Sequence, residues 1–265
     1  MKKLVIALTA LAAFTGSATA ADLAARPYTK APPPMAPVYN WTGFYIFGGG
    51  GYGMFDSNTY VTTFPGGAPL TIGQKVGGDG YFGTVGVGYD WQFSGSWVAG
   101  IFADGQFGSI KGSLTDPLLG PFGTAGQVKN RTNAAAGVRV GYLVAPNVYS
   151  YVNGGYSYGE FSGSTLLGNT SALAIATTPS FHRNGWFLGG GVENSLNIFG
   201  IAAPGWFMKT EYRFAEYERV NLPESFVGGN VATGLAVSAK PIVQTVSTSL
   251  VYRFNWGGAP LLAKY

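Results

Sequence analysis

The sequence predicts an all-β chain folded as an eight-stranded antiparallel up-and-down transmembrane β-barrel, and three observations lead to this prediction. Charged residues make up 11% of the 265 residues, aromatic residues make up 15%, and glycine occurs 42 times. An ordinary soluble domain has about 25% charged residues and about 7% glycine. Several segments alternate between apolar residues and small or polar residues, which is typical of strands with two unlike faces. Short and long connections alternate between these segments.

Residues 1–20 are expected to be a signal peptide. Lys2 and Lys3 precede an apolar run over residues 4–14, and Ala18-Thr19-Ala20 has the small-x-small pattern of a cleavage site. The run is too short for a membrane-spanning helix, which needs about 20 apolar residues. Removal of this segment leaves 14 basic residues (16 minus 2) against 12 acidic residues. This balance gives no support for binding to nucleic acid.

Residues 21–40 contain five prolines and are expected to form an extended periplasmic leader. The leader is interpreted as a spacer, with contact to the cell wall as the alternative. The barrel domain is expected over residues 41–254, followed by a C-terminal tail over residues 255–265.

The clearest alternation lies in residues 84–93. One face carries Val85, Val87, Tyr89, Trp91 and Phe93, and the other carries Thr84, Gly86, Gly88, Asp90 and Gln92. The same alternation predicts eight strands, although Phe102 breaks it by placing an aromatic residue on the polar face of its strand. Each strand is long enough to cross a bilayer at a tilt, for which about 9–11 residues suffice. These strands are expected at residues 41–53, 84–93, 97–108, 128–143, 148–161, 185–196, 206–217 and 242–254.

The predicted connections fall into two classes. Three residues join the second strand to the third and the fourth to the fifth, and about eight join the sixth to the seventh. Between these turns, long loops rich in Gly, Thr, Ser, Asn and Pro are expected at residues 54–80, 109–127, 162–184 and 218–240. Short periplasmic turns with four long extracellular loops are typical of barrels in an outer membrane.

Alternation alone allows two orientations of the faces. A soluble barrel or sandwich would turn its apolar face inward, whereas a membrane barrel turns it toward lipid. Glycine and serine suit the narrow interior of an eight-stranded barrel, and aromatic residues lie at the strand ends, where membrane barrels carry girdles. The girdle beside the short turns is predicted to contain Trp91, Phe93, Trp97, Tyr142, Trp206, Phe254 and Trp256. A second girdle is predicted at Tyr81, Phe107, Tyr158, Trp186 and Phe214.

Charged residues within the strands share the glycine and serine face. A charge that faced lipid at the midplane would cost about 2–4 kcal/mol, so these residues are expected to point into the lumen and pair there. The alternative is the solvated outer face of a soluble protein. Such pairs would fill the lumen, so a packed lumen is expected. The predicted lumen ion network consists of Asp104, Arg139, Glu193, Lys209, Glu211, Arg213 and Arg253.

Several motifs carry a family resemblance: Trp41-Thr-Gly-Phe-Tyr-Ile before a glycine run, Val85-Gly-Val-Gly-Tyr-Asp-Trp-Gln, Trp97-Val-Ala-Gly-Ile, Gly189-Gly-Gly-Val-Glu193, Lys209-Thr-Glu-Tyr and Tyr252-Arg-Phe254. The chain resembles the RopB/opacity-type outer-membrane β-barrel family, porin-like proteins of alphaproteobacterial type. Two departures stand out, since Phe102 replaces a frequent acidic residue and residues 255–265 extend past the usual terminal aromatic.

The resemblance implies a location in the outer membrane of Gram-negative bacteria and a porin-like or surface-antigen role. It implies that the barrel-assembly machinery reads the end of the last strand, where Leu250, Tyr252 and Phe254 form the expected assembly signal. Outer-membrane lipid and lipopolysaccharide are expected partners, with cell-wall or host-surface contacts as further candidates.

Three functions are left open: a structural or porin-like barrel that passes small solutes at most, a loop-mediated adhesion or recognition protein, and a lipid-modifying enzyme. Catalysis is the least favoured, because the chain has no cysteine and a single histidine, His182, which is expected on the surface of a loop near Ser180. Residues 48–53 and 78–83 match G-x-G-x-x-G by letter but lack a strand–helix context. No cofactor, metal or catalytic residue is predicted.

Overall fold

The computed structural model describes residues 39–198, 201–229 and 231–254. The predicted signal peptide, nearly all of the leader and the tail at residues 255–265 lie outside them. In the described part of the chain, no helix is long and apolar enough to cross a membrane. The strands are β1 (Gly43–Thr63), β2 (Gln74–Phe93), β3 (Trp97–Asp116), β4 (Thr124–Ala145), β5 (Val148–Phe161), β6 (Ser164–Gly168), β7 (Ala174–Thr178), β8 (Phe181–Ile198), β9 (Ile201–Tyr217), β10 (Val220–Phe226) and β11 (Ala232–Phe254).

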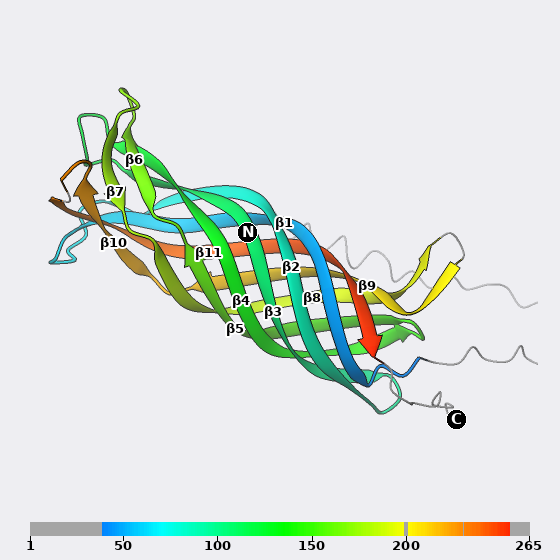
Figure 1. The fold of residues 1–265 in the computed structure, drawn as a ribbon. Coiled ribbons are helices and arrows are strands. Elements are labelled where there is room, and N and C mark those ends of the chain that lie inside the picture. The colour runs from blue at the N-terminus through cyan, green and yellow to red at the C-terminus, as the bar shows by residue number, and fades with distance from the viewer. Residues whose placement is uncertain (1–38, 199–200, 230, 255–265) are drawn as a thin grey trace, which may run out of the picture. The chain divides into compact units, whose positions relative to one another are not determined.

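Eight strands close into a ring in the order β1, β2, β3, β4, β5, β8, β9 and β11 (Figure 1). All neighbours are antiparallel, and β1 closes the ring against β11 over a long register from Phe44↔Phe254 to Thr63↔Leu235. Closure leaves no edge strand, so the backbone hydrogen bonds of the wall are satisfied between strands, as lipid requires. The predicted eight-stranded antiparallel β-barrel is therefore confirmed.

The wall continues past the ends of β5, β8 and β9. There β6 pairs with β4, β7 pairs with β6, and β10 pairs with both β7 and β11. The outer parts of β1, β2, β3, β4 and β11, together with β6, β7 and β10, therefore extend the wall beyond the eight-stranded ring, and we call this extension the distal ring. The paired register of β2 and β3 ends at Phe82↔Gly108. Figure 1 shows the distal ring at the end of the barrel away from the end of β11.

The structure corrects the prediction of four long loops. Most of residues 54–80, 109–127, 162–184 and 218–240 lie in strands, and the connection from β8 to β9 is also shorter than the predicted eight residues. The outward faces of these segments are largely polar, and apolar residues such as Phe55, Ile110 and Leu114 point inward, so these segments do not follow the apolar-outward alternation of the barrel wall. Pairing with a neighbour, as in the register from Ser57↔Pro241 to Tyr60↔Ser238, holds them extended.

The faces of the barrel are oriented as in a membrane protein. Val87 is 55% exposed and Leu250 is 49% exposed on the outer wall, whereas Arg139 is 3% exposed and Glu211 is 5% exposed inside. Glycine makes this interior possible, because a Cβ at Gly88 would collide with the ring of Tyr45 and with the backbone of β3. Small residues inside therefore leave room for bulky inward side chains from facing strands.

Candidate functional site

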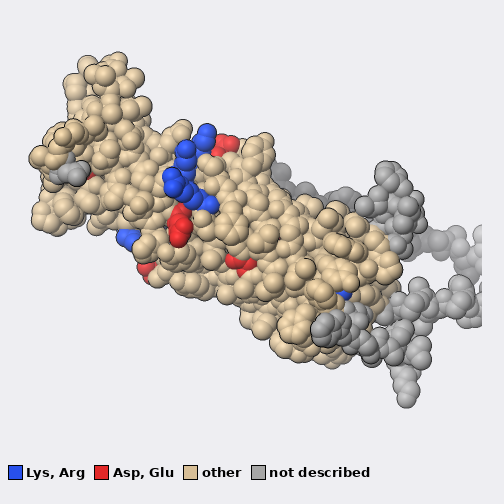
Figure 2. Space-filling model, viewed as in Figure 1, with Lys and Arg blue, Asp and Glu red and all other residues tan. Residues whose placement is uncertain are grey.

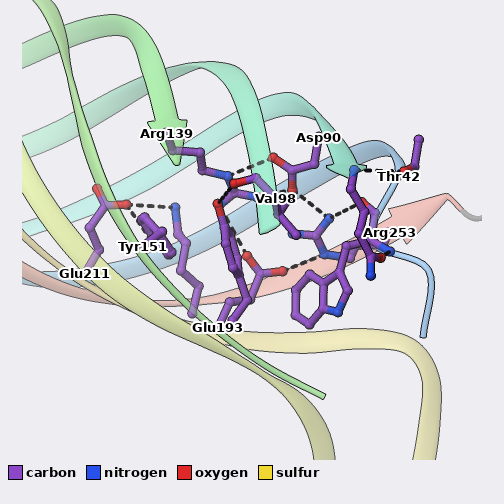
Figure 3. A network of polar contacts seen from close by, with 12 residues as sticks. Thr42, Asp90, Val98, Arg139, Tyr151, Glu193, Glu211 and Arg253 are labelled. Atoms are coloured by element: carbon purple, nitrogen blue, oxygen red, sulfur yellow. Dashed lines mark hydrogen bonds and ion pairs between the residues drawn. The ribbon is translucent and has the colours of Figure 1, made fainter. Parts of the chain in front are cut away.

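Two groups of paired charges cross the lumen. The first, which we call the Asp90 group, contains Asp90 of β2, Arg139 of β4, Glu193 of β8 and Arg253 of β11 (Figure 3). Arg139 contacts Asp90 at 2.5 Å and Glu193 at 3.3 Å. Arg253 contacts Asp90 at 2.8 Å and Glu193 at 2.7 Å. Two acids and two bases from four strands thus form a closed, neutral set of ion pairs.

Aromatic rings surround the Asp90 group. The guanidinium of Arg139 lies 4.3 Å from the centre of the Tyr45 ring, and that of Arg253 lies 4.5 Å from the centre of the Trp41 ring. Arg253 also donates a hydrogen bond to the backbone carbonyl of Trp41 at 3.3 Å. Such cation–π contacts stabilise a cation that has lost its water. Charge pairs and rings together fill this level of the lumen.

The second group, the Asp104 group, contains Asp104 of β3 and three charged residues of β9: Lys209, Glu211 and Arg213. Arg213 contacts Asp104 at 2.7 Å and Glu211 at 2.8 Å, and Lys209 lies 3.7 Å from Glu211. The hydroxyl of Tyr151 donates to Glu211 at 2.7 Å. This group is also neutral, and spacing by two residues along β9 places its three members on the inward face.

The aromatic residues at the turn end of the barrel lie on the outer wall. The rings of Trp97 and Tyr142 meet across β3 and β4 at 5.4 Å, and those of Trp206 and Tyr252 meet across β9 and β11 at 5.1 Å. At the other end, Tyr81, Phe107 and Trp186 are exposed on the wall. The outer surface is thus apolar between two levels of aromatic rings, the arrangement that suits a bilayer.

The comparisons with known proteins agree with this geometry. The chain is 30% identical to the 31 kDa outer-membrane immunogenic protein of Brucella melitensis over 267 residues, covering 96% of this chain and all of the relative. The protein of the same name from Brucella suis matches to the same extent. The chain belongs to the family of this outer-membrane immunogenic protein. The family model described as autotransporter beta-domain also matches residues 11–198, so the chain belongs to that family too.

A solved structure has the same fold as this member of the outer-membrane immunogenic protein family. The outer membrane protein OprG from Pseudomonas aeruginosa matches with a TM-score of 0.52 and 12% identity, covering 81% of this chain and 98% of that one. Together with the relatives, this places the protein in the outer membrane as an integral β-barrel.

The structure brings together all seven residues of the predicted lumen network, each buried and each in an ion pair. The prediction omitted Asp90, which contacts both arginines of its group. Asp90 lies on the polar face of residues 84–93, one residue before Trp91, and this position in the sequence could have placed it in the lumen. Phe102, which breaks the alternation, faces the lumen, where its ring lies 5.9 Å from that of Phe187.

The predicted girdle residues Trp91, Phe93, Trp97, Tyr142 and Trp206 are all exposed on the wall, Phe254 is half-buried, and Trp256 lies outside the described residues. Leu250 is exposed, and Tyr252 and Phe254 are half-buried, in alternation with buried Val251 and Arg253. His182 lies in strand β8 and not in a loop as predicted, because its segment pairs with β5. It is exposed, and its ring stacks on that of Tyr158 at 5.7 Å. Among the described residues, no three His, Asp or Glu side chains are grouped so that they could hold a metal ion.

The distal ring contains an acidic pair that sequence reasoning missed. Asp116 at the end of β3 and Glu224 of β10 are both buried, and Asp116 accepts a hydrogen bond from the backbone N–H of Leu118 at 2.6 Å. Burial, and then the negative charge of Asp116, raise the pKa of Glu224 to about 8. Glu224 is therefore protonated in the folded distal ring at neutral pH.

The stability of the distal ring is expected to fall as the pH rises from about 4.5 to about 8. In the unfolded segment Glu224 ionises near its ordinary pKa of 4.5, so the unfolded form releases a proton that the folded form keeps. The stabilisation of the distal ring by protonated Glu224 is complete below pH 4.5 and is lost as the pH passes 8. Limited proteolysis across this range, corrected for protease activity on a peptide, should show faster cleavage at higher pH. Glu224→Gln should remove this pH dependence of cleavage, and the exposed control Glu218→Gln should keep it. Equal pH profiles of cleavage for wild type, Glu224→Gln and Glu218→Gln would contradict the raised pKa of Glu224.

Proposed function

We propose that the protein is a plugged barrel that supports the envelope and presents its distal ring at the cell surface, rather than an open channel. The observation that carries the proposal is the filled lumen. Beyond the Asp104 group, a cavity lined by Gln106, Asn133, Arg213 and Tyr217 among others has a volume of about 10 Å³. That is about the volume for one water molecule, and open aqueous pores need about 16 strands.

Conductance across planar lipid bilayers tests this proposal. Purified folded barrel is expected to insert without a steady ion current, because the two charge groups and their aromatic neighbours block the path. The quadruple variant Asp90→Ala, Arg139→Ala, Asp104→Ala, Arg213→Ala removes one acid and one base from each group while keeping the net charge, and it is expected to pass small ions. A steady current through the wild-type barrel would contradict the plug, and gel mobility before and after boiling would confirm that each chain is folded.

A second candidate function, recognition through the distal loops, is favoured by a specific observation. Each of the four distal connections carries a large apolar side chain in an exposed position, among them Ile72 at 84% and Phe122 at 70% exposure, with Leu173 and Val231 in the other two. Apolar side chains at loop tips suit contact with another surface. If these tips bind a host surface, bacteria that display Ile72→Ser, Phe122→Ser and Leu173→Ser together should adhere less than wild type at equal levels of folded barrel.

The finer expectations belong to the same proposal. Residues 1–20 would direct export, the barrel-assembly machinery would read Leu250, Tyr252 and Phe254, and the motifs from Trp41 to Phe254 support a RopB/opacity-type subgroup. A catalytic role is not proposed. The ring of His182 packs on Tyr158 on the outer wall, and in the described chain no side-chain hydrogen bond links it to Ser180 or to a carboxylate.

A further inference from the structure

Two lysines lie directly opposite each other on the outer wall. Lys111 of β3 pairs in register with Lys129 of β4, and both are exposed because Ile110, Leu114 and Val128 occupy the inward positions. Side chains directly opposite on antiparallel strands have Cβ atoms about 4.5–5.5 Å apart, and like charges there destabilise the pair. Arg131 adds a third exposed cation two residues further along β4. We call these three residues the basic patch.

The charges of the basic patch are not neutralised within the described part of the chain, where its side chains form no ion pair and no hydrogen bond. Another outward cation, Lys240, contacts Glu216 at 2.7 Å. Two outward acids lie near the patch. Asp79 of β2 lines the same hollow as Lys111 and accepts a hydrogen bond from Tyr52, and Glu160 of β5 lies opposite Thr132. Figure 2 shows Lys and Arg side chains gathered on one face of the barrel, with acidic side chains on either side.

Two adjoining surface hollows meet at the basic patch. One, of about 500 Å³, is lined by Lys111, by a run of glycines in β2 and by the acid Asp79. The other, of about 640 Å³, is lined by Lys129 and Arg131 and by no acid. Both include Ser113 and Gln127, and the second adds Thr165 and other hydroxyls. Hydroxyl, amide and cationic donors facing the same open space suit an anion with several oxygen atoms, such as a phosphate group.

The basic patch begins where the apolar wall ends. Lys111 lies four residues beyond the exposed ring of Phe107, which is about 13 Å along the strand. Arg131 lies three residues beyond Ala134, the first of the outward apolar residues of β4, which is about 10 Å. The cations therefore stand at the depth of lipid headgroups on the side of the distal ring, with acyl chains against the wall below.

We propose that the basic patch is a binding site for the phosphate groups of a glycolipid in the outer leaflet, with lipid A as its chemical type. The site rests on the proposed orientation, in which the distal ring faces outward. The two hollows receive the phosphates, and the bound anion offsets the repulsion between Lys111 and Lys129.

The test compares lipid binding by four folded chains: wild type, Lys129→Gln, the triple variant Lys111→Gln, Lys129→Gln, Arg131→Gln, and the control Lys240→Gln. The control removes the same charge from the opposite side of the ring and breaks one exposed ion pair. The probes are nanodiscs of phosphatidylcholine that contain bis-phosphorylated lipid A or dephosphorylated lipid A, and inorganic phosphate alone. Gel mobility before and after boiling shows that each chain is folded.

Each removed cation is expected to weaken binding of bis-phosphorylated lipid A about fivefold, since one basic side chain near an anionic surface contributes about that factor. Added salt should reduce the difference in lipid A affinity between wild type and the triple variant. Lys240→Gln should bind lipid A as wild type does. Equal binding by wild type and the triple variant, or an equal loss in Lys240→Gln, would overturn the proposal. Equal losses with dephosphorylated lipid A or tight binding of inorganic phosphate would overturn a lipid phosphate as the ligand. A conducting wild-type barrel would instead contradict the plug and leave this result unaffected.

Discussion

Arg139→Met is expected to lower the free energy of unfolding by about 3–5 kcal/mol, the cost of breaking a buried ion pair from one side. Arg139 is buried and contacts both Asp90 and Glu193, so its removal leaves two carboxylates sharing the single guanidinium of Arg253. The methionine keeps much of the volume beside Tyr45, which limits the contribution of a cavity. The measurement is urea unfolding in lipid vesicles, followed by gel mobility without boiling.

The matched control for Arg139→Met is Lys240→Gln. It breaks the exposed pair with Glu216 and should cost about 0–1 kcal/mol. A double-mutant cycle of Asp90→Asn with Arg139→Met should give a coupling well above that of the exposed pair, and a parallel cycle of Glu211 with Arg213 tests the other group. If Arg139→Met unfolds at the same urea concentration as the control, the Asp90 group does not hold the barrel together.

Val87→Arg should destabilise the barrel by about 2–4 kcal/mol and lower the amount that inserts into membranes. Val87 is exposed on the wall between Tyr81 and Trp91, near the middle of the apolar band, where an arginine faces hydrocarbon. Urea unfolding in vesicles measures the change in stability, and membrane fractionation measures insertion.

The control for Val87→Arg is Asn58→Arg, which places the same charge on the outer wall of β1 in the polar zone beyond Tyr52. That position lies outside the hydrocarbon, so the cost should be about 0–1 kcal/mol. A soluble barrel would tolerate arginine equally at both positions, so equal stabilities would argue that the apolar wall does not face lipid.

The inner ring was predictable because it obeys one simple constraint. A strand between lipid and a narrow lumen must alternate bulky apolar residues with small or charged ones, and residues 84–93 show this in every position. The same constraint predicted that seven charged residues would share the lumen face. The distal strands escaped prediction because water lies outside them, so residues such as Ser57, Asn58 and Thr59 carry no periodic signal.

The partners of the charges could be known only from the tertiary structure. Asp90 and Arg139 are 49 residues apart, and the register of β2, β3 and β4 brings them within 2.5 Å. The same holds for the opposed Lys111 and Lys129, whose pairing depends on a register shift after Phe107. The sequence by itself determined which face of each strand meets lipid, because local alternation separates the two faces and the glycine, serine and charged residues of one face suit a narrow lumen rather than lipid. Which charges meet depended on strand order and register, because these bring distant residues together.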